Sequence, residues 1–260
     1  MGLTSRPAVR RLIEVACVAG INPYQLLSTA RRMPRFIREL RAYRRAETGE
    51  FPLDRGALKP ILVDYDAQAG VTGHYFHQDL WAARSIIARR PPRHYDIGSR
   101  IDGFVAHLLA VMPVTVIDIR PLDVEVQGLS FQQGSVVNLE GLADASIDSL
   151  STLHAIEHVG LGRYNDPIDP DGWRTAIAEL VRVLRPGGRL YFSVPIGRQR
   201  VLFNANRVFK VSTIIDAFAR LRLVSFAAVD DAGRFVPAAS LTAFDDANEA
   251  CGLFEFTKDA

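Results

Sequence analysis

Cysteine is scarce in this chain, because Cys17 and Cys251 are the only two among 260 residues and lie far apart. Two distant cysteines exclude a disulfide framework and a thiolate metal site, and they are typical of a reducing compartment. Long apolar runs are lacking as well, since none approaches the roughly 20 residues of a membrane-spanning helix. Glu14 interrupts the place of a signal-peptide core, so we expect a cytoplasmic protein.

Lysine, aspartate and histidine are absent from residues 1–50, which contain ten Arg and four Glu. The net charge of the whole chain is nevertheless only +2. A nearly neutral chain has no overall attraction for polyanions, so we expect no nucleic-acid partner. The hydrophobic fraction of 48% is ordinary for a globular protein and predicts a sizeable core.

Residues 23–47 predict a basic amphipathic helix. Its apolar residues recur at three- and four-residue spacing, and they are Leu26, Ala30, Met33, Ile37 and Leu40. Pro34 predicts a kink or a break. Two interpretations stay open: packing on the domain with a solvated basic face, or peripheral contact of residues 23–47 with an anionic membrane. Residues 1–75 are therefore expected to form a basic helical extension and linker, and residues 76–260 one domain.

From His94 on, short apolar runs alternate with helical patterns, which is typical of βαβ units around a parallel sheet. The predicted strands are 93–97, 114–118, 129–132, 148–153, 188–194, 222–229 and 252–258. The predicted helices are 78–90, 102–112, 171–185 and 212–220. Asp169 and Pro170 mark the start of helix 171–185, and Pro186 marks its end. This pattern predicts an α/β fold with a doubly wound, seven-stranded sheet.

Two of the predicted strands end in an acidic residue. Asp96 precedes a turn at Gly98, where backbone N–H groups can approach a ligand closely. Asp118 ends the next strand, where a carboxylate can accept both ribose hydroxyls of an adenosine ligand or, alternatively, cap a turn. The turn lacks the G-x-G-x-x-G spacing of dinucleotide folds, so an NAD-dependent oxidoreductase ranks below the other hypotheses.

The order of motifs in residues 93–195 resembles that of class I S-adenosylmethionine-dependent methyltransferases. The two acidic strand ends are followed by Gln133–Ser135, His154–Val159 (HAIEHV) and Leu184–Leu190 (LRPGGRL). A wider resemblance, over residues 74–258, is to a little-characterised bacterial branch linked to surface-polysaccharide biosynthesis. The resemblance implies a Rossmann-like, mostly parallel sheet whose last strand is antiparallel, and S-adenosyl-L-methionine as the cofactor.

The same resemblance implies a set of cofactor-binding residues. Asp96 would lie near the methionine amino group, Gly98 would leave room for the cofactor, Asp118 would hold the ribose, and Ser135 and Val136 would meet the adenine.

The sequence departs from the family pattern at two of these positions. Arg100 stands where a second glycine is usual, and it can either pair with the cofactor carboxylate or crowd the site. Ser135 replaces the common acid at the adenine end.

The HAIEHV run offers groups that can remove a proton from an acceptor hydroxyl. We expect His158 to be the base, with Asp166 as its orienting partner and His154 as a further candidate; alternatively, His158 only packs beside the adenine. The run also fits the H-x-x-E-H pattern of inverted zincins. His154 directly follows a predicted strand, which would keep the two histidines off one helical face, so we expect no metal.

The loop after the fifth predicted strand contains Arg198, Arg200 and Arg207, which are expected to contact phosphate or carboxylate of an acceptor or, alternatively, to be solvated. The resemblance implies O-methylation of a sugar of a surface glycan or its precursor. The location that we expect is cytoplasmic and, if residues 23–47 bind lipid, peripheral to the inner face of the membrane. The alternative is a degenerate fold that acts as a non-catalytic binding or scaffold protein, which Arg100 and Ser135 favour.

Overall fold

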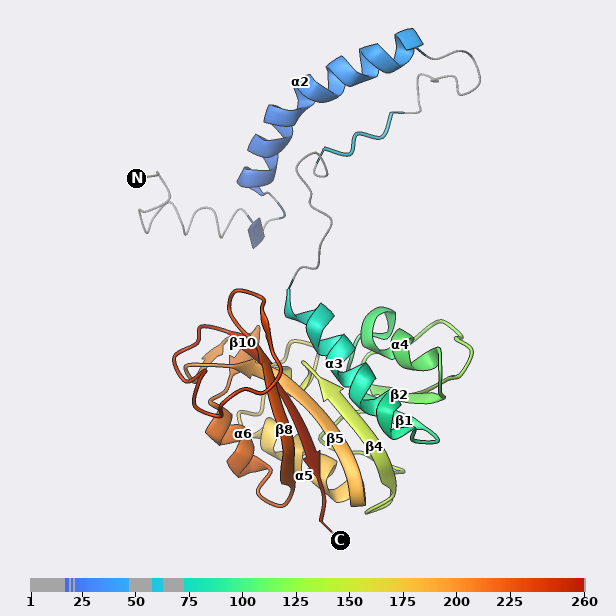
Figure 1. The fold of residues 1–260 in the computed structure, drawn as a ribbon, viewed down its shortest axis with the longest axis vertical. Coiled ribbons are helices and arrows are strands. Elements are labelled where there is room, and N and C mark those ends of the chain that lie inside the picture. Colours follow the sequence, from blue (N-terminus) through green and yellow to red (C-terminus); the bar gives the residue numbers. More distant parts are fainter. Residues whose placement is uncertain (1–16, 19, 21, 47–57, 63–72, 260) are drawn as a thin grey trace. The chain divides into compact units, whose positions relative to one another are not determined.

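The computed structural model describes residues 17, 18, 20, 22–46, 58–62 and 73–259 (Figure 1). These residues belong to two compact units, one within residues 1–70 and the other within residues 71–260, and each unit is considered by itself. Most of the predicted linker lies outside the described residues. Helix α3 (His74–Arg89) begins the second unit, so a boundary after residue 75 falls within its first turn.

Helix α2 (Pro23–Ala46) makes up most of the described residues of the first unit, and it is amphipathic and basic. The side-chain oxygen of Asn22 caps its start, because it accepts hydrogen bonds from the N–H groups of Tyr24 and Gln25 at 3.1 and 3.2 Å. The helix continues through Pro34, so the break that was one of two predicted outcomes does not occur. None of its residues is buried. Within the described residues, no helix combines the length and the apolar character that crossing a bilayer requires.

An eight-stranded sheet forms the centre of the second unit (Figure 1). In chain order its strands are β1 (His94–Ile97), β2 (Val114–Asp118), β3 (Leu129–Gln133), β4 (Ile147–Leu153), β5 (Leu184–Ile196), β8 (Arg222–Val229), β9 (Phe235–Val236) and β10 (Ala250–Thr257). Their spatial order is β3-β2-β1-β4-β5-β10-β8-β9. Neighbours among β1 to β5 pair in parallel, whereas β10 is antiparallel to β5 and β8. The predicted doubly wound, mostly parallel sheet with an antiparallel last strand is confirmed, and the two-residue strand β9 is added to the seven expected.

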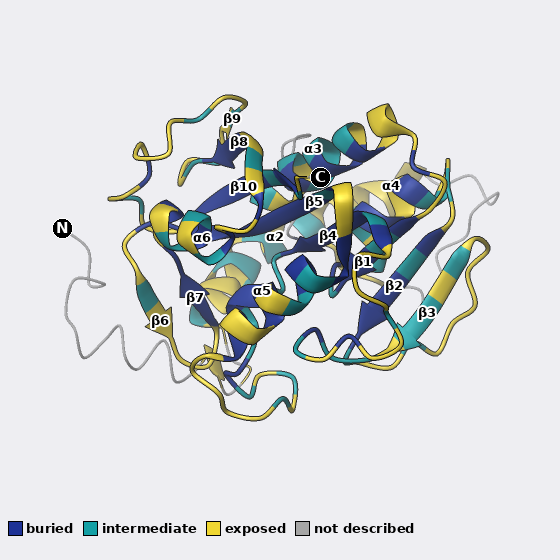
Figure 2. Cartoon of the chain, turned by 90° about the horizontal axis from the view of Figure 1, so that it is seen from below, coloured by how far each residue is buried: buried dark blue, intermediate teal, exposed yellow. Residues whose placement is uncertain are grey.

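Helices cover both faces of this sheet, as Figure 2 shows. Helix α3, a π-helical turn η3 (Ile101–Val105) and α4 (Ala106–Leu109) lie on one face. Helices α5 (Gly172–Val183) and α6 (Val211–Ala217) lie on the other. Strands between two helical layers are buried on both sides, which is why β2 consists of apolar and β-branched residues before its terminal Asp118. β4 is buried as well, but it also carries Ser149 and Ser151, whose hydroxyls pair with the buried ring of His94.

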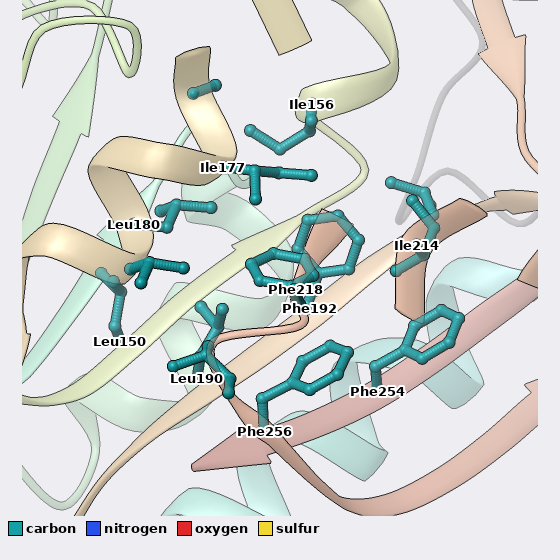
Figure 3. Close-up of a cluster of buried hydrophobic side chains, with 14 of the residues drawn as sticks. Leu150, Ile156, Ile177, Leu180, Leu190, Phe192, Ile214, Phe218, Phe254 and Phe256 are labelled. Carbon is teal, nitrogen blue, oxygen red and sulfur yellow. The ribbon is translucent and has the colours of Figure 1, made fainter. Parts of the chain in front are cut away.

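The larger hydrophobic cluster lies beneath α5 and α6 (Figure 3). Ile177 and Leu180 of α5 pack toward Leu150 of β4, and aromatic rings fill the space next to α6. Phe192 of β5 and Phe218 meet edge to face, with ring centroids 4.9 Å apart. This packing fixes β4 and β5, and with them the loops that leave their carboxyl ends.

Two helix boundaries differ from the prediction. Helix α5 begins at Gly172 rather than 171, because the Asp169 carboxylate accepts the N–H of Asp171 at 2.9 Å and closes a turn before the helix instead of capping it. The helix ends at Val183, and β5 begins at once at Leu184, where it pairs with β4. The predicted helix 102–112 is instead the π-helical turn η3 followed by the short helix α4.

A small antiparallel hairpin, β6 (Arg200–Leu202) and β7 (Asn206–Val208), was not predicted. It follows β5 directly and stays outside the main sheet. A parallel bridge between Ile196 and Phe209 attaches its base to the end of β5. The hairpin therefore lies at the carboxyl edge of the sheet.

Candidate functional site

Two adjoining cavities open at the carboxyl ends of the parallel strands. The first, the apolar cavity, measures about 180 Å³, and its walls include Ile97, Ile117, Val136 and Val137. The second, the polar cavity, measures about 290 Å³, and its walls include His74, Gln78, Asp79, Glu157, Asn206 and Glu249. The residues that line both are Gly98, Arg120, His154, His158 and Tyr164. One ligand with an apolar and a polar end could therefore occupy both cavities.

Asp96 ends a buried hydrogen-bond chain beneath the turn that follows β1. Its carboxylate accepts the N–H of Ser99 at 3.1 Å, the hydroxyl of Ser99 at 2.7 Å and the hydroxyl of Ser151. Nε2 of His94 lies 2.8 Å from Ser151 Oγ, and Nδ1 lies 2.7 Å from Ser149 Oγ. Because Ser151 gives its one proton to Asp96, His94 donates from Nε2 and accepts at Nδ1.

This environment changes the acidity of Asp96 and limits its role. Burial raises its pKa to about 6, although the hydrogen bonds from Ser151 and Ser99 oppose the rise. Asp96 is fully buried and lines neither cavity. In this structure it holds the turn through Ser99 rather than facing a ligand.

Gly98 occupies a position that only glycine fits. Its φ is 74°, and an added Cβ would lie 2.9 Å from Cβ of Ala155. Its N–H donates to the carbonyl of Ile117 at 3.0 Å, which fastens the turn to β2. The wall shared by the two cavities is therefore bare backbone, which a ligand can approach closely.

Asp118 lies at the end of β2 in the apolar cavity, where the resemblance placed it. Its carboxylate is held by Arg120: Oδ1 accepts the N–H and Nε–H at 2.8 and 2.9 Å, and Oδ2 accepts Nη2–H at 2.5 Å. The predicted ribose-binding group is thus paired with a cation two residues away. A ribose would have to share this carboxylate with Arg120.

Ser135 and Val136 follow β3 and line the apolar cavity, as expected for residues that meet an adenine. The Ser135 hydroxyl accepts the N–H of Val137 at 3.4 Å, and Val136 is buried. The wall at this end of the cavity is therefore a tight turn with aliphatic side chains, which suits a flat ring.

Arg100 neither fills the apolar cavity nor crowds the Gly98 turn. Its guanidinium makes a fork with the Asp102 carboxylate at 3.1 and 2.9 Å, and 66% of its side chain is exposed. It lines the rim of the polar cavity. Of the two predicted roles for Arg100, crowding the site does not occur.

His154 sits at the strand-to-helix turn after β4, with a φ of 51°. Its Nδ1 lies 3.0 Å from Oε1 of Glu157, its Nε2 lies 3.3 Å from Sγ of Cys251, and the ring of His74 stacks on it at 4.5 Å. Burial alone lowers the pKa of His154, but Glu157 and Cys251 outweigh it and hold the pKa well above its ordinary value. Both ring nitrogens of His154 thus already have partners, Glu157 and Cys251, which does not favour the predicted role of His154 as a base.

Two buried polar atoms of this cluster lack a hydrogen-bond partner among the described residues: Oε2 of Glu157 and Nε2 of His74. Both residues line the polar cavity. Burial lowers the pKa of His74 to about 4, so its ring is neutral at pH 7. An unpaired buried acceptor costs free energy, because it has lost its hydrogen bonds to water and gained none from the protein.

His158 ends the short 3₁₀ helix η4 (Ile156–His158) and lines both cavities. Its Nδ1 lies 2.6 Å from the carbonyl oxygen of Ala205, and its Nε2 lies 3.6 Å from Oε1 of Glu157. Burial lowers its pKa, and the Glu157 carboxylate opposes that shift. His158 is thus neutral at pH 7 and can accept a proton.

Asp166 does not orient His158, so this part of the prediction is wrong. Its carboxylate accepts the N–H groups of Gly160 and Tyr164 at 2.7 and 3.1 Å, which closes the loop between η4 and α5. The acidic neighbour of His158 is Glu157 instead.

The three arginines expected to meet an acceptor do not gather in one place. Arg207 is buried and donates to the carbonyls of Val159, Pro170 and Glu157 at 2.5, 3.2 and 3.4 Å. Arg200 donates to the carbonyl of Arg198 at 3.0 Å. Neither Arg198 nor Arg200 lines one of the two cavities. The prediction of acceptor contact is wrong for Arg207, because its guanidinium donates to backbone carbonyls and holds the loops together.

Sequence reasoning missed several residues of the site, namely His74, Gln78, Arg120, Tyr164 and Cys251. Arg120 has a local signal, since an Arg two residues after a strand-ending Asp can fold back on it. The ring of Tyr164 contacts two arginines: the guanidinium carbons of Arg120 and Arg163 lie 5.2 and 5.3 Å from the ring centroid. Cys251 has no local signal, because only the pairing of β10 with β5 brings it to His154.

The acidic and histidine side chains of the site do not form a metal centre. Among the described residues, no group of three or more His, Cys, Asp or Glu side chains is arranged to hold a metal ion. The two histidines of the H-x-x-E-H pattern do not share a regular helix: His154 lies in the turn after β4, and His158 ends the 3₁₀ helix η4.

The chain has a methyltransferase-like fold, as solved structures with the same architecture show. A chain from the complex of the Haloferax volcanii Trm112 methyltransferase activator with a methyltransferase is 18% identical, with a TM-score of 0.51 over 72% of this chain and 90% of that one. The Burkholderia thailandensis 1,6-didemethyltoxoflavin-N1-methyltransferase, solved with 1,6-didemethyltoxoflavin and S-adenosylhomocysteine, is 20% identical, with a TM-score of 0.51 over 71% and 80%.

A third structure, the N-methyltransferase NodS of Bradyrhizobium japonicum with S-adenosylhomocysteine, is 19% identical, with a TM-score of 0.50 over 71% of this chain and 87% of that one. Residues 130–226 match the family model described as Caenorhabditis protein of unknown function, DUF268. No curated protein matches the chain. These similarities show the fold and leave the reaction to be argued from the site.

Proposed function

We propose that this chain binds S-adenosylmethionine across the two cavities and transfers its methyl group to an acceptor. The observation that carries the proposal is the placement of Gly98 directly after β1 and of Asp118 at the end of the neighbouring strand β2. Both residues line the apolar cavity, and the carboxylate stands where ligands bind in open α/β sheets. Two of the three structures compared above contain S-adenosylhomocysteine.

The two cavities suit the two ends of such a ligand. Asp118, Ser135 and Val136 would hold the adenosine in the apolar cavity. The turn of Gly98, Ser99 and Arg100 lines the polar cavity and would hold the amino-acid end. When bound, the sulfonium supplies an electrophilic methyl group, so the protein's task is to align the acceptor and remove its proton.

His158 is the residue that we assign to proton removal. It borders both cavities, and its neutral ring can take the proton that an acceptor hydroxyl loses as the oxygen forms its bond to the methyl carbon. Glu157, 3.6 Å from Nε2, would stabilise the resulting imidazolium. Nδ1 of His154, 3.0 Å from Oε1, holds the Glu157 side chain in place beside His158.

For the acceptor we propose a sugar hydroxyl of a surface glycan or its precursor. The polar cavity is lined by amide and carboxylate side chains, and these are Gln78, Asp79, Asn206 and Glu249. Such groups accept and donate the hydrogen bonds that a polyhydroxyl ligand offers. The sequence resemblance to a polysaccharide-associated branch supports the same choice.

Calorimetric titration with S-adenosylhomocysteine tests the cofactor site. We expect the wild-type chain to bind and Asp118→Ala to bind at least about tenfold more weakly, because charge-assisted hydrogen bonds contribute about 1.5–3 kcal/mol. Asp123→Ala, which removes an exposed acid of the β2–β3 loop, is the matched control and should bind as the wild type does. No binding by the wild type would overturn the proposal.

A non-catalytic binding or scaffold role is the second candidate. The observation that favours it is the fork between Arg120 and Asp118, which occupies both carboxylate oxygens. If it is right, neither the wild type nor Arg120→Ala binds S-adenosylhomocysteine.

Helix α2 supports a further part of the proposal, peripheral contact with an anionic membrane through residues 23–47. Its arginines and its exposed Leu26 and Ile37 match a helix that lies in the bilayer interface. The Arg31→Glu, Arg38→Glu double variant should bind vesicles of equal phosphatidylcholine and phosphatidylglycerol at least about 30-fold more weakly, because each lost basic residue contributes about 1 kcal/mol. Arg220→Glu, an exposed arginine of the second unit, is the control. Unchanged binding of the double variant would exclude a role for α2.

A further inference from the structure

The β6–β7 hairpin presents three consecutive large apolar residues to solvent (Figure 2). Val201 exposes 54% of its surface, Leu202 38% and Phe203 75%. Phe203 is the most exposed large apolar residue in the described part of the second unit. Single exposed apolar side chains are ordinary, but a contiguous group at a projecting tip is typical of an interaction surface.

The segment that carries this tip is cationic and contains no acid. Residues 196–215 include Arg198, Arg200, Arg207 and Lys210 and no Asp or Glu. Arg207 is buried, whereas Arg198 and Lys210 are exposed and Arg200 is half-buried. An apolar tip with cations at its base matches an anionic bilayer interface, where aromatic and aliphatic side chains enter the acyl boundary and cations remain at the headgroups.

The hairpin is also attached to the polar cavity. The carbonyl of Ala205 accepts hydrogen bonds from Nδ1 of His158 at 2.6 Å and from Arg163 at 2.8 Å. Asn206 lines the cavity and follows Phe203 by three residues, so their Cα atoms lie within about 11 Å of each other. This distance is similar to the roughly 5–10 Å to which interfacial elements enter a bilayer.

We propose that the β6–β7 tip inserts into the surface of an anionic membrane and holds the polar cavity at the bilayer interface. The acceptor is then a membrane-anchored molecule whose hydroxyl group enters the polar cavity from the lipid surface. The membrane contact rests on the hairpin alone, whereas the statement about the acceptor rests on the proposed methyl transfer. The contact is also separate from α2, which belongs to the other unit.

Site-specific fluorescence quenching tests this contact in the full chain. A Phe203→Trp variant is mixed with vesicles of equal phosphatidylcholine and phosphatidylglycerol in which the phosphatidylcholine is brominated on its acyl chains. We expect the emission of the new tryptophan to shift to the blue and to be quenched by the brominated lipid. The wild-type chain, which contains only Trp81 and Trp173, gives the background that is subtracted. The control is Val111→Trp, because Val111 is 59% exposed and lies before β2, at the amino end of the sheet.

The outcomes separate this inference from the others. Quenching of Phe203→Trp but not of Val111→Trp supports it, and equal quenching of the two or none overturns it. Insertion into vesicles of phosphatidylcholine alone, at the same level, would overturn the requirement for anionic lipid. A tip that serves a protein partner instead would give no quenching in either vesicle.

Charge substitutions give a second measurement that does not depend on a new fluorophore. Val201→Asp should lower partition into the anionic vesicles about tenfold, because a carboxylate at the tip would lose its hydration on entering the apolar part of the bilayer. Val111→Asp, at a similarly exposed position, should leave the partition unchanged. Equal losses of partition in the two variants would contradict the inference. S-adenosylhomocysteine titration of the same variants is the separate check: failure of the wild type to bind overturns the proposed methyl transfer but not the membrane contact.

Discussion

Arg120 holds both carboxylate oxygens of Asp118, the acid that ends β2. The side chain of Asp118 is 10% exposed and that of Arg120 is 51% exposed. The carboxylate is therefore fixed in the cavity wall, whereas the guanidinium of Arg120 can move into solvent. The pair therefore sets a competition between an internal cation and any ligand hydroxyl for the same oxygens.

The first prediction concerns this competition. Arg120→Ala should bind S-adenosylhomocysteine about two- to fivefold more tightly than the wild type, because a half-exposed ion pair contributes up to about 1 kcal/mol. Calorimetric titration measures the change. Arg234→Ala is the control, since it removes a similar Arg–Asp fork, with Asp230, whose residues do not line either cavity. Weaker binding by Arg120→Ala would mean that Arg120 contacts the ligand itself.

The second prediction concerns Gly98. Gly98→Ala should abolish S-adenosylhomocysteine binding and lower the free energy of unfolding by about 2–4 kcal/mol, from left-handed strain and overlap with Ala155. Gly233→Ala has nearly the same φ, 77°, with nothing within 4 Å of the added Cβ. It isolates the strain and should cost only about 1–2 kcal/mol. Denaturant unfolding and calorimetry measure both effects, and equal losses in the two variants would exclude a steric role for Ala155.

The third prediction concerns the buried ring of His94. Burial lowers its pKa from 6.5 to about 3, so between these values the unfolded chain binds a proton that the folded chain does not. His94 therefore contributes stability above pH 6.5 that is lost as the pH falls toward 3, by up to about 1.4 kcal/mol per pH unit. His94→Gln should be less stable at pH 7 and should lose less stability than the wild type between pH 6.5 and 4.

Denaturant unfolding at several pH values in this range measures that difference in slope. Asp96 acts in the opposite direction, because its raised pKa favours the folded state at acidic pH and this contribution is lost as the pH rises through about 6. The wild-type slope alone is therefore a sum, and only the comparison with His94→Gln isolates the histidine. His107→Gln, at an exposed position, should leave the slope unchanged. Parallel slopes for His94→Gln and wild type would contradict the prediction.

The fourth prediction separates structural from exposed arginines. Arg207→Ala removes a buried donor to three carbonyls and should lower the free energy of unfolding by about 3 kcal/mol. Arg198→Ala, on the same connection but exposed, should change it by less than about 0.5 kcal/mol. Thermal unfolding compares the two, and a small effect at Arg207 would show that the carbonyls find other donors.

The strands followed from patterns that are local in sequence, whereas the antiparallel last strand was implied by the family resemblance. The runs at 114–118 and 222–229 are predicted with the bounds that β2 and β8 have, because short runs of apolar and β-branched residues are typical of strands. Helix ends were less predictable. The start of α5 depends on the turn that Asp169 makes with Asp171, and the start of β5 depends on pairing with Ile147, which no local pattern reveals.

The positions of four predicted cofactor-binding residues follow from their place in the fold. Gly98, Asp118, Ser135 and Val136 lie at strand ends and line the apolar cavity. The partners of His158 were not predictable, because Glu157 and Asp166 are both acids near it in sequence and only the folded loop decides which one it meets. For the same reason Arg207, which the sequence places with Arg198 and Arg200, points into the protein instead.

Strand β10 lies between β5 and β8, although it follows every other strand of the sheet in the chain. During translation β5 and β8 therefore leave the ribosome with one edge of each unpaired, and they stay so until residues 250–257 arrive. Unpaired strand edges are templates for association with other chains. A chain whose synthesis stops before residue 250 should consequently aggregate, and such nascent chains should depend on cellular chaperones that shield these edges.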